Sequence, residues 1–231
     1  MRWLWALAVV ASPAAAVTCE DIEHLSASYT VCEVAASEDL QLFLRDDAGE
    51  ILGSFNAVER QEGRDLLFAM NGGMYHDDRR PVGHYLEHGI EEQRLITTDG
   101  PGNFGLLPNG VFCIGKTLQV LETRAYAAEQ TACTHATQSG PMLVIDGALH
   151  PRFIPGGSSR FIRNGVGTTA DGTRAVFAIS NDAVNFHDFG TLFRDRLSLP
   201  NALYFDGKVS RMMDAASGRS DFGWQMGPIV G

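Results

Sequence analysis

Positive charge is scarce in this sequence of 231 residues. It has 18 Lys and Arg against 28 Asp and Glu, which gives a formal net charge of −10. A chain this acidic lacks the positive surface with which proteins bind nucleic acid or anionic membranes. We therefore expect neither as a partner, and an anionic substrate would have to be held locally by a few arginines.

Several catalytic motifs are absent as well. The sequence contains no G-x-S-x-G elbow and no H-E-x-x-H helix, which excludes the common serine hydrolases and zinc proteases. It has no C-x-x-C pair either, so a zinc site built from its cysteines is not indicated.

Long apolar runs are missing after the first residues. The N-terminus, MRWLWALAVVASPAAAVTCE, has one arginine, an apolar run from Trp3 to Ala11 and the small residues Ala14, Ala15 and Ala16. This pattern predicts a signal peptide over residues 1–16, cut before Val17, and an exported mature chain that is periplasmic or secreted. The alternative, a retained membrane anchor, needs a longer apolar run than this one.

The four cysteines all follow the predicted cleavage site, which favours two disulfides in an oxidising compartment. Four cysteines allow three pairings. Short loops close most readily, so we favour Cys19 with Cys32 and Cys113 with Cys133. Each bridge would add about 3 kcal/mol by restricting the unfolded chain.

Short apolar runs bounded by glycine, asparagine or aspartate dominate the rest of the chain and predict β-strands. Asp146-Gly147 and Asp171-Gly172 each separate two such runs and predict hairpin turns, so much of the sheet should be antiparallel. We expect one α+β domain over residues 17–231, with a mixed, largely antiparallel sheet and two or three helices. The predicted strands are 31–35, 40–44, 66–70, 118–121, 142–145, 175–179 and 202–205.

Two segments have helical patterns. In FHDFGTLFRDRLSLP the apolar residues fall on one face, with Asp188 as the expected N-cap and Pro200 as the stop. In NAVERQEG, Asn56 and Glu59 have the spacing of a capping box, and Gly63 would end the helix.

Polar residues gather where apolar runs end, which is where a rigid scaffold displays functional side chains. Glycines there let the backbone approach a ligand, and arginine offers a fork of donors that suits phosphate. For each stretch a simple turn or a surface ion pair remains an alternative. The four stretches are AMNGGMYHDDRRPVG (Ala69 to Gly83), TQSGPML with Ser139 and Gly140, SSRFIRNGVG with Arg160, Arg163 and Asn164, and NALYFDGKVSR with Asp206 and Arg211.

Histidines near the first stretch leave a divalent metal as an open alternative. His84 and His88 are four residues apart, with His76 and Asp77 close by in the sequence. Gly83 and Gly89, which flank them, disfavour a helix there, so the four-residue spacing loses its usual meaning. We predict no cofactor, and keep a metal-dependent phosphodiesterase that uses His76, Asp77 and His84 as a rival.

Taken in order, the stretches AMNGGMYHDDRRPVGHYLEHG, GNFGLLPNGVF, ATQSGPMLVIDGALHPRF, SSRFIRNGVGTTADG, AISNDAVNFHDFGTLFRD and PNALYFDGKVSRM resemble the phosphodiester glycosidase family, in its bacterial exported branch linked to exopolysaccharide. The resemblance runs from about Cys19 to Gly231. It implies an α+β fold and hydrolysis of a sugar 1-phosphodiester of the N-acetylglucosamine type. By motif, it places around one pocket Asn71, Gly72, Gly73, Ser139, Gly140, Arg163, Ser180, Asp206 and Arg211. Asn164, next to Arg163, is a further candidate for substrate binding.

Roles for some of these residues follow from the chemistry. Cleavage of the anomeric C–O bond expels a phosphate monoester, which needs positive charge on the phosphate and a carboxylate near the anomeric carbon. Arg163 and Arg211 are candidates for the first role, together with the Gly72 and Gly73 N–H groups. Asp206 is the candidate for the second, as nucleophile or as base on water.

One position departs from the family's pattern. The apolar-Asp-Gly-Gly motif reads Phe205-Asp206-Gly207-Lys208 here, so a lysine stands at the second glycine. A non-catalytic envelope protein that binds a phosphoglycan or exopolysaccharide on the same fold is the alternative function. It would keep the arginines and glycines but tolerate loss of Asp206. The oligomeric state is not indicated.

Overall fold

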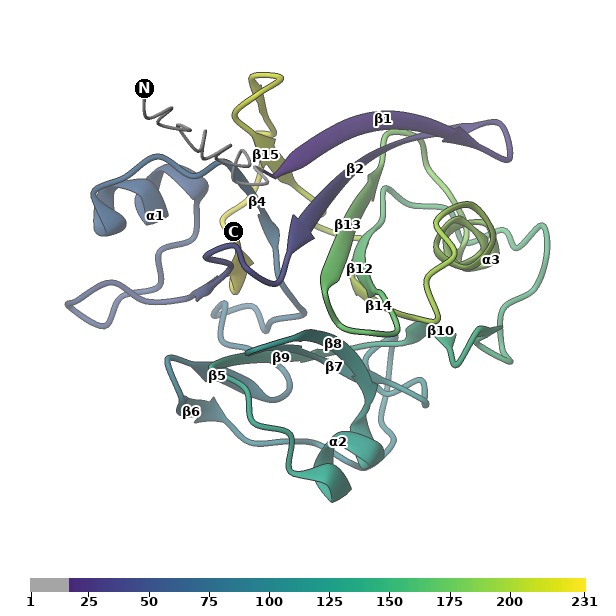
Figure 1. Cartoon of the computed structure of the whole chain (residues 1–231), viewed down its shortest axis with the longest axis horizontal. Helices are drawn as coiled ribbons and strands as arrows, with labels where there is room; N and C mark the ends of the chain where they lie inside the picture. Colours follow the sequence, from purple (N-terminus) through teal and green to yellow (C-terminus); the bar gives the residue numbers. More distant parts are fainter. Residues whose placement is uncertain (1–16) are drawn as a thin grey trace, which may run out of the picture.

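The computed structural model describes residues 17–231, which form three antiparallel sheets and three α-helices around a shared core (Figure 1). The predicted signal peptide, residues 1–16, lies outside the described residues. The predicted α+β class and single domain are confirmed. The predicted strands divide among three sheets, and every strand pair within them is antiparallel.

The largest sheet has seven strands in the order β1-β2-β13-β12-β14-β10-β11. Its central strands are buried almost throughout because both faces are covered: Phe177 and Ile179 face the core between the sheets, while Val176 and Ala178 face α3. The strands are β1 (Thr18–His24), β2 (Ala27–Ala35), β10 (Met142–Ile145), β11 (Ala148–Leu149), β12 (Asn164–Thr168), β13 (Arg174–Ser180) and β14 (Asn201–Asp206).

Two five-stranded sheets complete the fold, in the orders β16-β15-β4-β17-β3 and β6-β5-β9-β7-β8. The first contains β3 (Leu42–Phe43), β4 (Phe68–Asn71), β15 (Met212–Asp214), β16 (Arg219–Ser220) and β17 (Ile229–Val230). The second contains β5 (Tyr85–Glu87), β6 (Ile90–Gln93), β7 (Gly110–Ile114), β8 (Leu118–Glu122) and β9 (His135–Ser139).

Both predicted hairpin turns are present. β10 and β11 are antiparallel around Asp146 and Gly147, which have φ values of 46° and 81°. β12 and β13 are antiparallel around the turn that contains Gly172, at φ 67°. Positive φ at these positions is what Asp-Gly sequences tolerate.

The helices cover the outer faces of the sheets. α1 (Phe55–Glu62) lies against the sheet that holds β4, and α3 (Phe186–Thr191) lies against the seven-stranded sheet (Figure 1). Phe55 and Val58 of α1 and Phe189 of α3 supply the apolar contacts. A π-helical turn, Leu192–Arg196, continues α3, and α2 (Thr123–Glu129) follows β8. No helix within residues 17–231 is long and apolar enough to cross a membrane.

Both predicted N-caps were wrong by a few residues. The Ser54 hydroxyl accepts from Ala57 N–H and caps α1, so Asn56 lies inside the helix, although Gly63 ends it as expected. Asn185 caps α3 and forms a reciprocal pair with Asp188, which is therefore the third helical residue. In each case the helix begins earlier because a capping side chain precedes the first apolar residue.

The favoured disulfides are both present, Cys19 with Cys32 and Cys113 with Cys133. The first joins β1 to β2 at the edge of the seven-stranded sheet, and the second joins β7 to the segment before β9. Each therefore ties neighbouring strands whose chain separation is short.

Candidate active site

Three strand termini from different parts of the chain meet at one place. β4 ends at Asn71, β14 ends at Asp206, and β12 begins at Asn164, which lies opposite Asp206 in the sheet. The Asn71 and Asn164 side chains form a reciprocal amide pair with N–O distances of 3.2 and 3.0 Å. This pair joins the β4 sheet to the seven-stranded sheet.

Both asparagines are fully buried and hold the loop that follows β14. Asn164 Oδ1 accepts from Asp206 N–H at 3.1 Å and from the Ser210 hydroxyl at 3.3 Å, and Asn71 Oδ1 accepts from Arg211 N–H at 2.9 Å. The side-chain oxygens of the two asparagines thus fix the backbone positions of Asp206 and Arg211.

The Asp206 carboxylate accepts hydrogen bonds from three backbone N–H groups of the loop that follows it. Its Oδ1 accepts from the backbone N–H groups of Gly207 and Lys208 at 2.6 and 2.9 Å, and its Oδ2 accepts from Val209 N–H at 3.1 Å. An ionised carboxylate has about four lone-pair positions, so one on Oδ2 is left for a ligand.

The two glycines after β4 bring the backbone against β9 and β17. Gly72 N–H donates to Pro228 O at 2.8 Å, and Gly72 O accepts from the Thr137 hydroxyl at 2.8 Å. A Cβ on Gly73, at φ 156°, would lie 2.7 Å from Thr137 Oγ1. Close packing therefore requires glycine here, and the Gly72 N–H already has a partner.

Ser139, Gly140 and Ser180 are buried next to these strand ends. The Ser139 hydroxyl donates to Phe205 O at 3.2 Å, and Ser180 Oγ accepts from Arg163 N–H at 2.9 Å. A Cβ on Gly140 would lie 2.7 Å from Asn109 Cβ. The three residues position β14 and Arg163 through packing and hydrogen bonds.

Arg163 is a buried cation, with only 1% of the residue exposed. Its guanidinium donates to Val184 O, Ser159 O and the Tyr204 hydroxyl, and lies 3.7 Å from the centroid of Phe186. Burial lowers its pKa. Within residues 17–231 no carboxylate forms an ion pair with it.

The Arg211 side chain holds the loop after β16 in place through hydrogen bonds. Its guanidinium donates to Asp221 O at 2.6 and 2.9 Å and to Trp224 O at 2.8 Å. Burial lowers its pKa, and the nearby Asp221 acts in the opposite sense. Both arginines that the sequence assigned to phosphate thus have backbone carbonyls as partners.

A cavity of about 880 Å³ opens in front of these residues, a size suited to a ligand of one or two sugar rings. Of the ten residues that the sequence assigned to the site, Asp206 alone lines it. The other nine support the cavity from within the protein, and we call five buried polar residues among them the wall: Asn71, Ser139, Arg163, Asn164 and Ser180. The lining residues are Met74, Tyr75, His76, Asp77, Arg79, Val82, Asn103, Asp206, Lys208, Val209, Trp224 and Gln225.

Two cations line this cavity beside Asp206. Arg79 comes from the turn after the glycines, where it has φ 69°, and Lys208 follows Asp206. Tyr75 lies near both carboxylate and arginine charges: burial, and then Asp206, raise its pKa to about 12, while Arg211 and Arg79 oppose the shift. Tyr75 therefore remains a hydrogen-bond donor at neutral pH.

Sequence reasoning did not single out Tyr75, Arg79, Asn103 or Trp224 as site residues. Arg79 lies in the charged run directly after the glycines, which is a usable signal. Lys208 departs from the family's pattern, and in the structure it lines the cavity. Trp224 belongs to no sequence motif, so only its exposure in the folded structure identifies it as a candidate site residue.

The residues of the proposed metal site are not brought together. His76 and Asp77 line the cavity, whereas His84 is buried elsewhere, 3.1 Å from Gln93 O and 3.1 Å from the Tyr126 hydroxyl. Within residues 17–231 no group of three or more potential metal ligands occurs.

One nucleotide-binding pattern is fortuitous. Gly110 to Thr117, GVFCIGKT, fits the letters of a P-loop. In a real P-loop the turn after the strand leads into a helix whose N-terminus binds phosphate. Here the turn joins β7 to β8 in an antiparallel hairpin, so this cradle is not formed.

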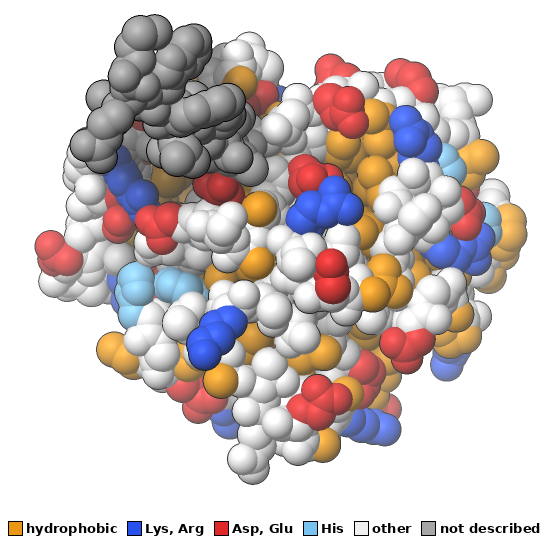
Figure 2. All heavy atoms as spheres, in the orientation of Figure 1, with side chains coloured by type: hydrophobic (Ala, Val, Ile, Leu, Met, Phe, Trp, Pro, Cys, Tyr) orange, Lys and Arg blue, Asp and Glu red, His pale blue; other side chains and the backbone are white. Residues whose placement is uncertain are grey.

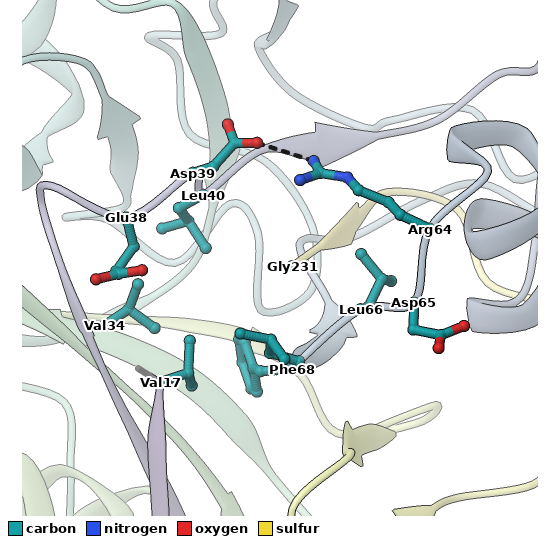
Figure 3. Close-up of a pocket in the computed structure, with 11 residues that line it drawn as sticks. Val17, Val34, Glu38, Asp39, Leu40, Arg64, Asp65, Leu66, Phe68 and Gly231 are labelled. Atoms are coloured by element: carbon teal, nitrogen blue, oxygen red, sulfur yellow. Dashed lines mark ion pairs between the residues drawn. The ribbon is translucent and has the colours of Figure 1, made fainter. Parts of the chain in front are cut away.

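A second cavity, of about 260 Å³, lies beside Gly231 on another part of the surface (Figure 3). Glu38, Asp39 and Asp65 contribute three carboxylates to it. Arg64, the only basic side chain among the described residues that line it, is paired with Asp39 at 2.9 Å. Its charge would repel an anionic ligand. On the face of the molecule in Figure 2, the Lys and Arg side chains are scattered singly and are not gathered in one patch.

Comparisons with known proteins agree with this picture. The phosphodiester glycosidase family model matches residues 64–226. The chain is 32% identical over 230 residues to the Escherichia coli (strain K12) protein named uncharacterized protein YigE, covering 97% of this chain and 89% of that protein. The fold is similar to the zebrafish N-acetylglucosamine-1-phosphodiester alpha-N-acetylglucosaminidase catalytic domain auto-inhibited by its pro-peptide, with a TM-score of 0.61 and 13% identity over 93% of this chain and 81% of that chain.

Proposed function

Because this chain belongs to the phosphodiester glycosidase family, we propose that it is an exported hydrolase that cleaves the anomeric C–O bond of a sugar 1-phosphodiester. The substrate is of the N-acetylglucosamine 1-phosphodiester type and belongs to exopolysaccharide or envelope glycan metabolism. One observation carries the proposal: a single cavity is lined by the carboxylates of Asp206 and Asp77 and by two cations, Arg79 and Lys208.

Arg79 and Lys208 bind the phosphodiester in this proposal. The bridging phosphate carries one negative charge in the substrate and gains a second as the C–O bond breaks, so cations beside it favour the transition state over the bound substrate. A phosphate monoester is already a good leaving group. Protonation of the departing oxygen by a strong acid is therefore less important than in ordinary glycoside hydrolysis.

Asp206 acts at the anomeric carbon, as nucleophile or as base on water. In the base route, water forms the new bond to the anomeric carbon, its proton goes to Asp206, and the bonding electrons leave with the phosphate oxygen. The three N–H groups on the carboxylate hold it in one orientation, and the remaining lone pair of Oδ2 faces no partner within the described loop.

Arg163 and Arg211 act from behind as positioning residues. Arg163 donates to the Tyr204 hydroxyl, which lies beside Gly207. Arg211 is held at Asn71 through its N–H and binds the loop that carries Trp224. Their charges raise the local potential without a direct contact to substrate.

The alternative is a phosphoglycan-binding protein without catalysis. The observation in its favour is that Asp206 does what a structural turn residue does, since its carboxylate bonds mainly to its own backbone. Such a protein would bind the same ligands through Arg79 and Lys208 and would leave them intact.

The test is phosphorus NMR of the purified, oxidised protein with a panel of sugar 1-phosphodiesters in oxygen-18 water. We expect a new phosphomonoester signal without label in the phosphate, because water attacks carbon. Label in the phosphate, with loss of activity in a chelator, would instead establish a metal-dependent phosphodiesterase. An unchanged spectrum for ligands that bind would establish the binding protein.

A further inference from the structure

An arginine outside the cavity holds the loop of residues 221–225, which brings Trp224 to the cavity. Arg219, on β16, donates from Nε and Nη2 to the two carboxylate oxygens of Asp221, at 3.0 Å each. A bidentate pair of this kind is stronger than a single hydrogen bond and fixes the relative direction of the two groups. Asp221 is the first residue of the loop, so its orientation sets where the loop starts.

The same guanidinium also reaches the seven-stranded sheet. Its Nη1 donates to Thr30 Oγ1 at 2.7 Å and to Asn181 Oδ1 at 2.9 Å. Thr30 lies on β2 and Asn181 directly follows β13, whereas β16 belongs to another sheet. Arg219 therefore ties the start of the loop to a different layer of the fold. It is partly buried and is not one of the residues that line the cavity.

Asp221 connects this attachment to Arg211. The Asp221 carbonyl oxygen accepts from Arg211 Nε and Nη2 at 2.9 and 2.6 Å, and Asp221 Oδ2 accepts from Met212 N–H at 3.0 Å. Arg211 also donates to Trp224 O at 2.8 Å. These contacts share Asp221, so a change in its orientation would alter the position of Trp224.

Asp206 is held by contacts that Arg219 does not make. Its N–H donates to Asn164 Oδ1, and its carboxylate accepts from N–H groups of its own loop. A change at Arg219 should therefore move the side of the cavity formed by residues 221–225 and leave the carboxylate in place.

We infer that Arg219 is a positioning residue that acts through Asp221 and Arg211 and determines how tightly the cavity binds substrate. This inference rests on the proposed function. If the loop were loose, the substrate would have to order it, and that cost would appear as weaker binding. The rate of the bound complex would change little, because the carboxylate that acts on it keeps its place.

The experiment compares Arg219→Gln, Asp221→Asn and the double variant with Arg174→Gln as the matched control. Asp221→Asn keeps an oxygen for Met212 N–H and removes the charge that Arg219 pairs with. Arg174, at the start of β13, also donates to a carboxylate, that of Glu33 at 2.8 Å, but this pair lies within the seven-stranded sheet.

Two properties are measured in each variant. The chain has three tryptophans, so in a background with Trp3→Phe and Trp5→Phe the anisotropy of indole fluorescence reports the mobility of Trp224 alone. Steady-state kinetics with the α-N-acetylglucosamine 1-phosphodiester of methanol gives KM and kcat. If wild type does not turn this diester over, its Kd by calorimetry takes the place of KM.

We expect Arg219→Gln and Asp221→Asn each to lower the anisotropy of Trp224. Each should raise KM about fivefold and leave kcat within about twofold of wild type. Since both remove the same contact, the double variant should differ little from either single variant. Arg174→Gln should change neither property.

Unchanged anisotropy of Trp224 in the two single variants would overturn the inference, as would additive effects in the double variant or a loss confined to kcat. If Arg219→Gln does not fold, Asp221→Asn alone decides by the same criteria of anisotropy and KM. The anisotropy does not depend on hydrolysis. Lack of turnover by wild type would therefore refute the proposed hydrolase, while the anisotropy and Kd still decide the role of Arg219.

Discussion

The wall of the cavity and its mouth use polar side chains in opposite ways. In the wall, formed by Asn71, Ser139, Arg163, Asn164 and Ser180, every residue is buried and its polar atoms bond to other parts of the protein. At the mouth, Lys208 and Trp224 are exposed and belong to short loops. In the proposed function, the wall therefore fixes the geometry of the site and the mouth contacts the ligand.

The largest effect should come from breaking the wall at Arg163. Arg163→Ala would remove the guanidinium donor from Val184 O, Ser159 O and the Tyr204 hydroxyl and would open a cavity beside Phe186. We expect a loss of about 4 kcal/mol in the free energy of unfolding, measured by urea denaturation. Arg160→Ala, three residues away and exposed, should cost under ~1 kcal/mol. Similar losses in both variants would contradict the contrast.

Asp206 belongs to both regions, because it closes a loop and lines the cavity. Asp206→Asn keeps an oxygen for Gly207 and Lys208 N–H, and we expect kcat/KM to fall at least ~100-fold while folding is largely retained. Asp214 is the matched control, since it too caps its own turn, through Ala216 and Ser217 N–H. Asp214→Asn should leave kcat/KM within about twofold. If Asp206→Asn retains more than about a tenth of the wild-type rate, Asp206 does not have the proposed catalytic role.

Acid should lower the stability of the fold through a histidine that is buried outside both regions. Burial, and then the neighbouring His88, lower the pKa of His135 to about 4, with Asp39 acting in the opposite sense. Below pH 6.5 the unfolded chain takes up a proton that the folded chain does not accept until about pH 4, so stability is lost as pH falls through this window.

Wild type should lose about 2 kcal/mol more between pH 7 and pH 4.5 than His135→Gln, which removes that titration. Chemical denaturation at the two pH values measures the difference. Parallel stability curves for the two proteins would contradict a depressed His135 pKa.

The smallest effect should come from the mouth. Lys208→Gln should raise KM for a phosphodiester about tenfold, with stability unchanged, and should reduce the salt dependence of kcat/KM. Lys116→Gln, in the β7–β8 hairpin, is the control for the loss of one exposed lysine. Unchanged KM in Lys208→Gln would place the phosphate elsewhere in the cavity.

Most of the wall could be predicted from the sequence, because its residues end predictable strands. Asn71 and Asp206 follow apolar runs directly, and turn chemistry marks the glycines. The mouth could not be predicted in the same way. Arg79 and Trp224 reach the cavity only because β4 and β15 pair and residues 221–225 fold back toward α1. Local sequence does not encode that arrangement. The helix caps were missed for a related reason: several Ser, Asn and Asp residues compete for each cap, and packing decides.

The position of β4 between β15 and β17 has a consequence for how the chain folds. Met70 pairs with Met212 on one side and with Val230 on the other, so both neighbours of β4 come from the far end of the sequence. The strand that ends in the two glycines stays without partners until residues 212–230 have been synthesised. Contacts this remote slow folding and keep two strand edges open meanwhile. A chain truncated before β15 would therefore expose both edges of β4 and should aggregate.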